Sequence, residues 1–89
     1  MTEREVTIVN QLGLHARAAA KLVNTAGAFG SEVLVVRDNE EADAKSILGI
    51  LLLAAPQGSR LTVRCTGADE EKALQAVTRL FADGFGEAS

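Results

Sequence analysis

Residues 32–44 read Glu-Val-Leu-Val-Val-Arg-Asp-Asn-Glu-Glu-Ala-Asp-Ala, and they decide which kind of sheet this chain can form. Valine and leucine between Glu32 and Arg37 predict a strand, and Asp38-Asn39 supplies turn residues after it. Glu40–Ala44 is expected to return as a short second strand. Strands joined this tightly pair antiparallel, because a parallel pair needs a crossover of a dozen or more residues. The sheet is therefore not all-parallel.

Further strands and helices extend this hairpin in both directions. Val6–Val9 is rich in β-branched residues, and apolar and polar residues alternate from Arg60 to Thr66, so each segment is expected to be a strand. A helix is predicted from His15 or Ala16 to Gly27, and Gly27 with Gly30 predicts a left-handed cap at its end. Its apolar face carries Ala19, Leu22, Val23 and Ala26.

Two shorter signals complete the pattern. The apolar run Ile47–Ala55 predicts a short buried helix with Ser46 as its N-cap, stopped by Pro56. A last helix is expected to open at Asp69 and to stop at Gly84, with an inner stripe of Leu74, Val77, Leu80 and Phe81. The order βαββαβα is best packed with helices on one face of an antiparallel sheet, an α+β fold. We expect one domain over residues 1–89.

Composition excludes several classes of protein. The net charge is -3, with 9 basic and 12 acidic residues and no basic stripe, so no nucleic-acid partner is expected. Cys65 is the only cysteine, which excludes an internal disulfide and favours an inert core thiol. No signal peptide is recognisable, and the longest apolar run is too short for membrane insertion. We therefore expect a cytoplasmic chain, with Phe29 and Phe81 in its core.

The single histidine is the most informative residue. His15 lies in Gly13-Leu-His-Ala-Arg17, where a glycine loop meets an amphipathic helix. Free N–H groups at a helix start favour an anion, here the backbone of Ala16, Arg17 and Ala18. Neutral imidazole is a competent nucleophile, and the Arg17 guanidinium could hold phosphate oxygens. The sequence thus predicts a phosphoryl-accepting histidine, although a helix-start or surface histidine without chemistry explains the same spacing.

Other candidate groups are few. Ser46 is expected to cap its helix, and the same position would also tolerate a phosphate. One histidine and one cysteine form no metal ligand set, and no cofactor-binding motif is present, so neither a metal nor a cofactor is expected. No triad of the serine-protease kind can be built from a single histidine.

These residues resemble the histidine-containing phosphocarrier proteins (HPr) of the bacterial phosphoenolpyruvate phosphotransferase system. The resemblance rests on Gly13-Leu-His-Ala-Arg17, Lys45-Ser-Ile-Leu-Gly49 and Gly67-Ala-Asp-Glu70, which occur in the family's order over nearly the whole chain. It implies an open-faced sandwich, with a four-stranded antiparallel sheet of order 1-4-2-3 covered on one face by three helices. Three stretches look like those of proteobacterial members: Ala18-Ala-Ala-Lys-Leu, Leu53-Ala-Ala and Gly84-Phe-Gly-Glu.

The resemblance also implies a division of roles. His15 would be phosphorylated on Nδ1 by enzyme I and would pass the group to an enzyme IIA, with Arg17 beside it. Ser46 would be the target of a regulatory serine kinase and phosphorylase in some bacteria. The apolar residues Ile47, Leu48 and Leu51 would form part of the docking surface, unless they belong to the core. We expect the chain to act as a monomer and not as an enzyme on its own.

The sequence departs from the family at Ala18, where proline usually follows the active-site arginine. Alanine restores one N–H at the helix start and is a good helix former, so phosphoryl transfer is expected to survive. Two alternatives stay open. The chain could serve a nitrogen or metabolic regulatory branch instead of sugar uptake, or it could be an interaction module that transfers no phosphoryl group.

Overall fold

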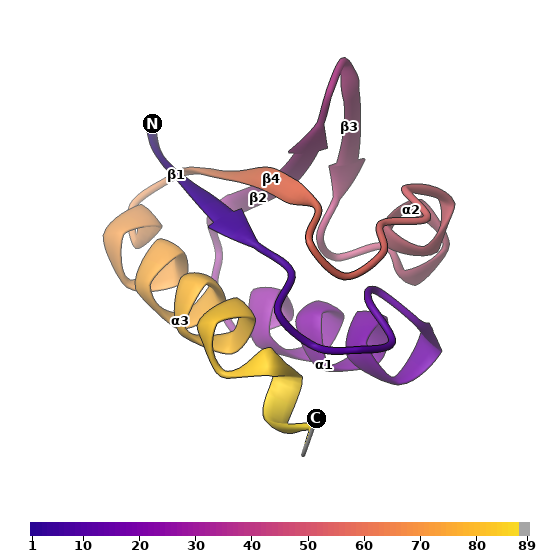
Figure 1. Cartoon of the computed structure of the whole chain (residues 1–89). Coiled ribbons are helices and arrows are strands. Elements are labelled where there is room, and N and C mark those ends of the chain that lie inside the picture. Colours follow the sequence, from indigo (N-terminus) through magenta and orange to yellow (C-terminus); the bar gives the residue numbers. More distant parts are fainter. Residues whose placement is uncertain (88–89) are drawn as a thin grey trace.

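The computed structural model describes residues 1–87 and confirms the order βαββαβα (Figure 1). The elements, in chain order, are β1 (Thr2–Thr7), α1 (Ala16–Gly27), β2 (Glu32–Arg37), β3 (Glu40–Asp43), α2 (Ile47–Leu52), β4 (Arg60–Thr66) and α3 (Glu70–Ala82), followed by a 3-10 turn, η1 (Gly84–Gly86).

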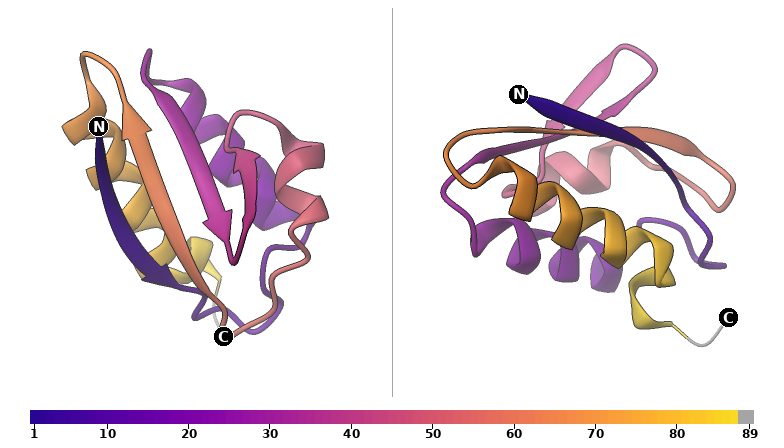
Figure 2. Two further views of the ribbon diagram at one scale, coloured as in Figure 1. Left: turned by 90° about the horizontal axis from the view of Figure 1, so that it is seen from above. Right: turned by 90° about the vertical axis from the view of Figure 1, so that its left-hand side faces the viewer.

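The strands form one antiparallel sheet in the order β1-β4-β2-β3, as the resemblance implies. The β2–β3 hairpin closes with Arg37 opposite Glu40, and Asp38 takes a φ of 55° in the turn. Asparagine and aspartate tolerate this left-handed conformation better than most residues. The three helices lie on one face of the sheet, and β1 and β3 are its edges (Figure 2).

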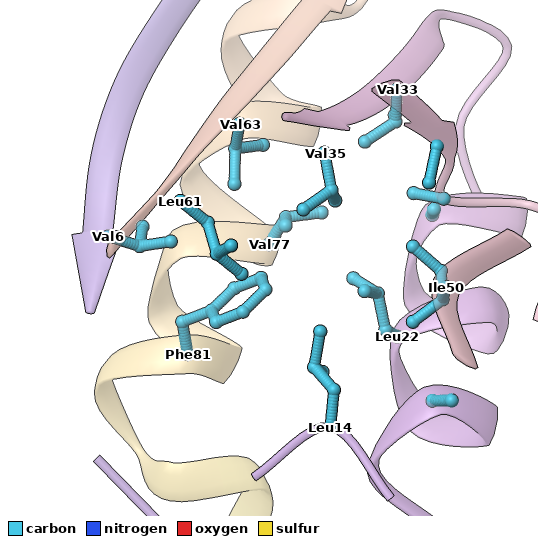
Figure 3. Packing of buried hydrophobic residues seen from close by; sticks show 14 of the residues in the cluster. Val6, Leu14, Leu22, Val33, Val35, Ile50, Leu61, Val63, Val77 and Phe81 are labelled. Atoms are coloured by element: carbon cyan, nitrogen blue, oxygen red, sulfur yellow. The ribbon is translucent and has the colours of Figure 1, made fainter. Parts of the chain in front are cut away.

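Alternation along the strands builds the core between the sheet and the helices (Figure 3). Every second side chain of a strand faces the helices, which buries Val33 and Val35 from β2 and Leu61 and Val63 from β4. Helices α1, α2 and α3 complete the core with, among others, Leu22, Ile50, Leu74, Val77 and Phe81.

Cys65 lies in the same core, as predicted. Its side chain is fully buried on the helix-facing side of β4. Burial, helped by the negative charges of Glu70 and Asp69, raises the pKa of its thiol. The neutral thiol is a poor nucleophile, so Cys65 acts as a small apolar residue.

The first strand differs from its prediction. It spans Thr2–Thr7, whereas Val6–Val9 was expected, because the ladder with β4 pairs Thr2 with Cys65 and Thr7 with Arg60. The helices cover only one face of this edge strand, so its charged side chains lie in solvent and lose no hydration. Val9 lies beyond the ladder and is 49% exposed.

The ends of two helices also differ. No left-handed cap ends α1: Gly27 is helical, and Ala28 has a φ of −74° with its N–H bonded to the last turn. Helix α2 ends at Leu52, short of the predicted Ala55, because the chain turns left-handed at Ala54, with a φ of 50°. Arg37 of β2 donates to the Leu53 carbonyl in this turn at 2.8 Å.

The aromatic residues of the core are also not those expected. Phe81 is buried as predicted, but Phe29 is only half-buried. Phe85 in η1 is fully buried and packs edge-to-face on Phe81, with ring centroids 5.0 Å apart.

Asp69 is the N-cap residue of α3, as expected, but its side chain makes no hydrogen bond to the helix. The carboxylate instead accepts hydrogen bonds from the Gly30 N–H at 3.0 Å, the Ser31 N–H at 2.9 Å and the Ser31 hydroxyl. These bonds, the one from the Ser31 side chain foremost, lower the pKa of Asp69 below the ordinary value of an aspartate. The carboxylate therefore ties the start of α3 to the segment between α1 and β2.

We predict that Asp69→Asn lowers the free energy of unfolding at pH 7, and that the deficit disappears in acid. A carboxyl whose folded pKa is depressed stabilises the fold above its unfolded pKa, and this contribution is lost as the pH falls through the folded pKa. Urea unfolding of both proteins between pH 7 and pH 2 measures the difference. A deficit that persists unchanged at the lowest pH would contradict this role for the Asp69 charge.

Candidate functional site

The loop before α1 is fixed by backbone contacts that only glycine allows. Gly13 has a φ of +67°, and a Cβ there would lie 2.5 Å from the Ala55 carbonyl oxygen. The next residue, Leu14, is buried and donates its N–H to that same oxygen at 3.0 Å. Gly13 thus combines a close backbone approach with a conformation that favours glycine. The loop holds His15 in place.

His15 is the N-cap residue of α1, and its side chain stays free of the helix. Its backbone is extended, with φ −77° and ψ 178°, and its carbonyl accepts the Ala19 N–H at 2.9 Å. The N–H groups of Ala16, Arg17 and Ala18 precede this first intrahelical bond. Within residues 1–87 they have no acceptor. Ala16 and Arg17 are exposed, so their N–H groups are available to an anion at the helix start, whereas Ala18 is fully buried.

Arg17 lies at the same end of α1 and is exposed. Within the described chain its guanidinium makes no ion pair or hydrogen bond, so all its donors are available to a ligand. The structure therefore brings together the helix start and the cation that the sequence singled out. Within residues 1–87, no hydrogen bond joins the Arg17 and His15 side chains.

A residue that the sequence analysis missed completes this arrangement. Nε2 of His15 forms a very short hydrogen bond with Oε2 of Glu87, 72 positions further along the chain. The other carboxylate oxygen of Glu87 accepts from Nδ2 of Asn10 at 3.1 Å, and the same Nδ2 donates to the Gly13 carbonyl at 2.8 Å. Asn10 is buried, so it joins the loop to the carboxylate. Nδ1 of His15 has no partner within residues 1–87.

The Glu87 carboxylate is electrostatically suited to this position. The hydrogen bond from His15, more than the bond from Asn10 and the charges of His15 and Lys21, lowers the pKa of Glu87. Lys21 of α1 also donates to the Phe85 carbonyl at 2.6 Å, which holds η1 against α1. The ionised Glu87 favours the tautomer that carries the proton on Nε2 and leaves the Nδ1 lone pair free.

Helix α2 presents the second group of predicted residues. The Ser46 hydroxyl caps α2 by accepting the Gly49 N–H at 3.2 Å, and the serine is exposed. Ile47 and Leu48 are 44% and 64% exposed, whereas Leu51 packs partly against the core. Figure 1 shows α2 on the same side of the molecule as the start of α1.

We predict that Ala18→Pro leaves the phosphorylation of His15 intact. The Ala18 N–H lies in the first turn and has no intrahelical acceptor, so a proline there breaks no helix hydrogen bond. The variant loses only one of three free donors at the helix start. The rate of phosphorylation and a crystal or NMR structure of the variant would check this expectation. Loss of phosphorylation in a folded variant would show that Ala18 is required.

Comparisons with known proteins agree with this geometry. The family model described as "PTS HPr component phosphorylation site" matches residues 2–83. A phosphocarrier protein HPr of Cupriavidus necator is 49% identical over 98% of both chains. A phosphocarrier protein NPr of Shewanella violacea is 45% identical over 98% of this chain and 96% of its own.

Solved structures give the same result. The crystal structure of HPr-C-His from Thermoanaerobacter tengcongensis superimposes with a TM-score of 0.96 at 43% identity, covering 100% of both chains. None of the helices within residues 1–87 has the length and hydropathy to cross a bilayer. The chain belongs to the HPr family of phosphocarrier proteins of the phosphotransferase system.

Proposed function

We propose that His15 accepts a phosphoryl group on Nδ1 from phosphorylated enzyme I, supplied by phosphoenolpyruvate, and passes it to an enzyme IIA. One observation carries the proposal: the His15 ring lies at a helix start whose exposed residues Ala16 and Arg17 have unbonded N–H groups, and Glu87 bonds Nε2 of the ring. Nδ1 is therefore the nitrogen left for chemistry. The exposed Arg17 guanidinium and the amides of Ala16, Arg17 and Ala18 are positioned to offset the charge of the incoming group.

The transfer step follows from these positions. The Nδ1 lone pair forms the new N–P bond while the bond between phosphorus and the donor nitrogen breaks, and the donor keeps that electron pair. The ring then carries a phosphoryl group on Nδ1 and a proton on Nε2, and so gains positive charge. The Glu87 carboxylate beside Nε2 stabilises this charge, and the reverse sequence releases the group to the acceptor.

The direct test is the intact mass of the protein after incubation with enzyme I and phosphoenolpyruvate. We expect a gain of one phosphoryl group, lost again in acid, because a phosphoramidate hydrolyses where a phosphoserine does not. A control carrier must be modified in the same mixture. No gain under these conditions favours the alternative of an interaction module without phosphoryl transfer.

The identity of the acceptor distinguishes a role in sugar uptake from a role in a nitrogen or metabolic regulatory branch. Phosphorylated protein would be mixed with a sugar-specific enzyme IIA and, separately, with an enzyme IIA of a nitrogen or metabolic regulatory system. Faster transfer to the sugar-specific protein supports a role in uptake, and the opposite order supports the regulatory branch. The chain is similar to a protein named HPr and to another named NPr, which is a reason to test the two acceptors side by side.

Ser46 is proposed as a regulatory site and Ile47, Leu48 and Leu51 as part of the docking surface. The exposed serine is accessible to a kinase, and a phosphate at the start of α2 would place negative charge beside exposed apolar residues. We predict that Ser46→Asp slows phosphorylation by enzyme I, whereas Ser46→Ala affects mainly the cap of α2. The two initial rates decide this, and equal rates for both variants would remove the proposed role of charge.

A further inference from the structure

A groove of about 640 Å³ lies between the edge strand β1 and helix α3. Its lining includes Arg4, Val9, Thr78, Arg79 and Ala82, and none of the residues discussed above for phosphoryl transfer. A smaller hollow along α3, lined by Lys72 among others, adjoins the groove, and Gln75 and Arg79 line both. Figure 2 shows β1 as the outermost strand, with α3 running beneath the same edge of the sheet.

The β1 edge has backbone groups available for another strand. The Ile8 N–H donates to the Ser59 carbonyl at 2.9 Å, on the β4 side. The backbone groups of alternate residues in an antiparallel strand point to the same neighbouring strand. The N–H and C=O groups of Val6 and Arg4 therefore also point toward β4. The N–H and C=O groups of Glu3, Glu5 and Thr7 therefore point to the free edge. Among residues 1–87 no backbone group bonds to them there.

Two of the three charged residues that line the groove are cationic, Arg4 and Arg79, although the whole chain carries a net charge of -3. The third, Glu5, alternates with the buried Val6, so its side chain belongs to the opposite face of the strand. Arg4 reaches from β1 toward the Thr78 hydroxyl of α3 at 3.5 Å, and neither Arg4 nor Arg79 pairs with a carboxylate in the described chain. Lys72 and Arg79 are seven positions apart, which is about 10 Å along a helix. An extended segment of roughly three to four residues covers that distance.

We propose that this groove binds an extended acidic peptide segment of a partner protein, which adds to β1 as a fifth strand. Backbone hydrogen bonds to Glu3, Glu5 and Thr7 would provide affinity, and carboxylates facing Arg4 and Arg79 would provide selectivity. The charged side chains of β1 discourage pairing with unrelated strands, as edge strands commonly require. None of the residues that line the groove belongs to the start of α1. A peptide segment bound in the groove therefore leaves His15 accessible.

The probe is the peptide acetyl-Asp-Val-Asp-Val-Asp-Val-amide, titrated into ¹⁵N-labelled protein. We expect saturable shifts of the amides of Glu3, Glu5 and Thr7 and of α3 residues that line the groove. A fully N-methylated peptide should not bind, because it cannot donate strand hydrogen bonds, and a peptide with Lys in place of Asp should not bind either. Shifts centred on α1 and α2 would overturn the proposal.

Variants test the charge. Arg4→Gln with Arg79→Gln should weaken binding about threefold to tenfold, since two solvent-exposed ion pairs with the peptide are removed. Arg37→Gln with Lys45→Gln removes the same charge near the β3 edge of the sheet, away from the groove, and should leave binding unchanged. Equal weakening by both pairs, equal binding of the N-methylated peptide, or self-association of the free protein through β1 in sedimentation would each contradict the proposal.

Discussion

His15→Ala is expected to keep its unmodified mass after incubation with enzyme I and phosphoenolpyruvate, while the wild-type protein gains one acid-labile phosphoryl group. His15 is the only histidine, and no other side chain lies at the start of α1 with a free nucleophilic nitrogen. The expected effect is complete loss of the modification, because no neighbouring group can replace the attacking lone pair.

Two controls separate chemistry from folding. The His15 ring does not cap the helix but bonds Glu87, so His15→Ala should stay folded and unfold cooperatively at a somewhat lower urea concentration than the wild type. Glu87→Gln keeps the ring and removes the negative charge beside Nε2, and it should still be phosphorylated, but more slowly. A His15→Ala protein that is folded and still gains the acid-labile group would disprove the assignment of His15.

Phe85→Ala is expected to lose about 3–5 kcal/mol of unfolding free energy, a large part of the stability of so small a domain. The Phe85 ring is fully buried and meets the Phe81 ring edge-to-face. Its φ of 58° is equally unfavourable for alanine, so the substitution relieves no backbone strain and the loss reports the ring alone. Urea unfolding should show a lower midpoint with little change in slope.

Phe29→Ala is the matched control for this prediction. The same side chain is removed, but Phe29 is only half-buried against the core, so a loss of about 1 kcal/mol is expected. A Phe85→Ala loss no larger than that of Phe29→Ala would mean that η1 does not belong to the folded core. In that case Glu87, two positions beyond Phe85, would also lack a fixed place beside His15.

The sequence by itself determined the features that depend on neighbouring residues. Asp38-Asn39 specified the antiparallel hairpin, because a two-residue connection allows no other pairing. Alternation from Arg60 to Thr66 specified which side of β4 is buried, and Ser46 specified the start of α2 through a bond three positions away. His15 and Arg17 were found for the same reason, since they lie within one short motif at a helix start.

Tertiary structure alone decided the features that depend on distant partners. The extent of β1 follows from its ladder with β4, and the turn after α2 is held by Arg37 of β2, which donates to the Leu53 carbonyl. The contact between Glu87 and His15 joins residues 72 positions apart and requires Phe85 in the core and Lys21 on its carbonyl. No local pattern encodes such a contact, because its energy exists only after the sheet and helices have packed.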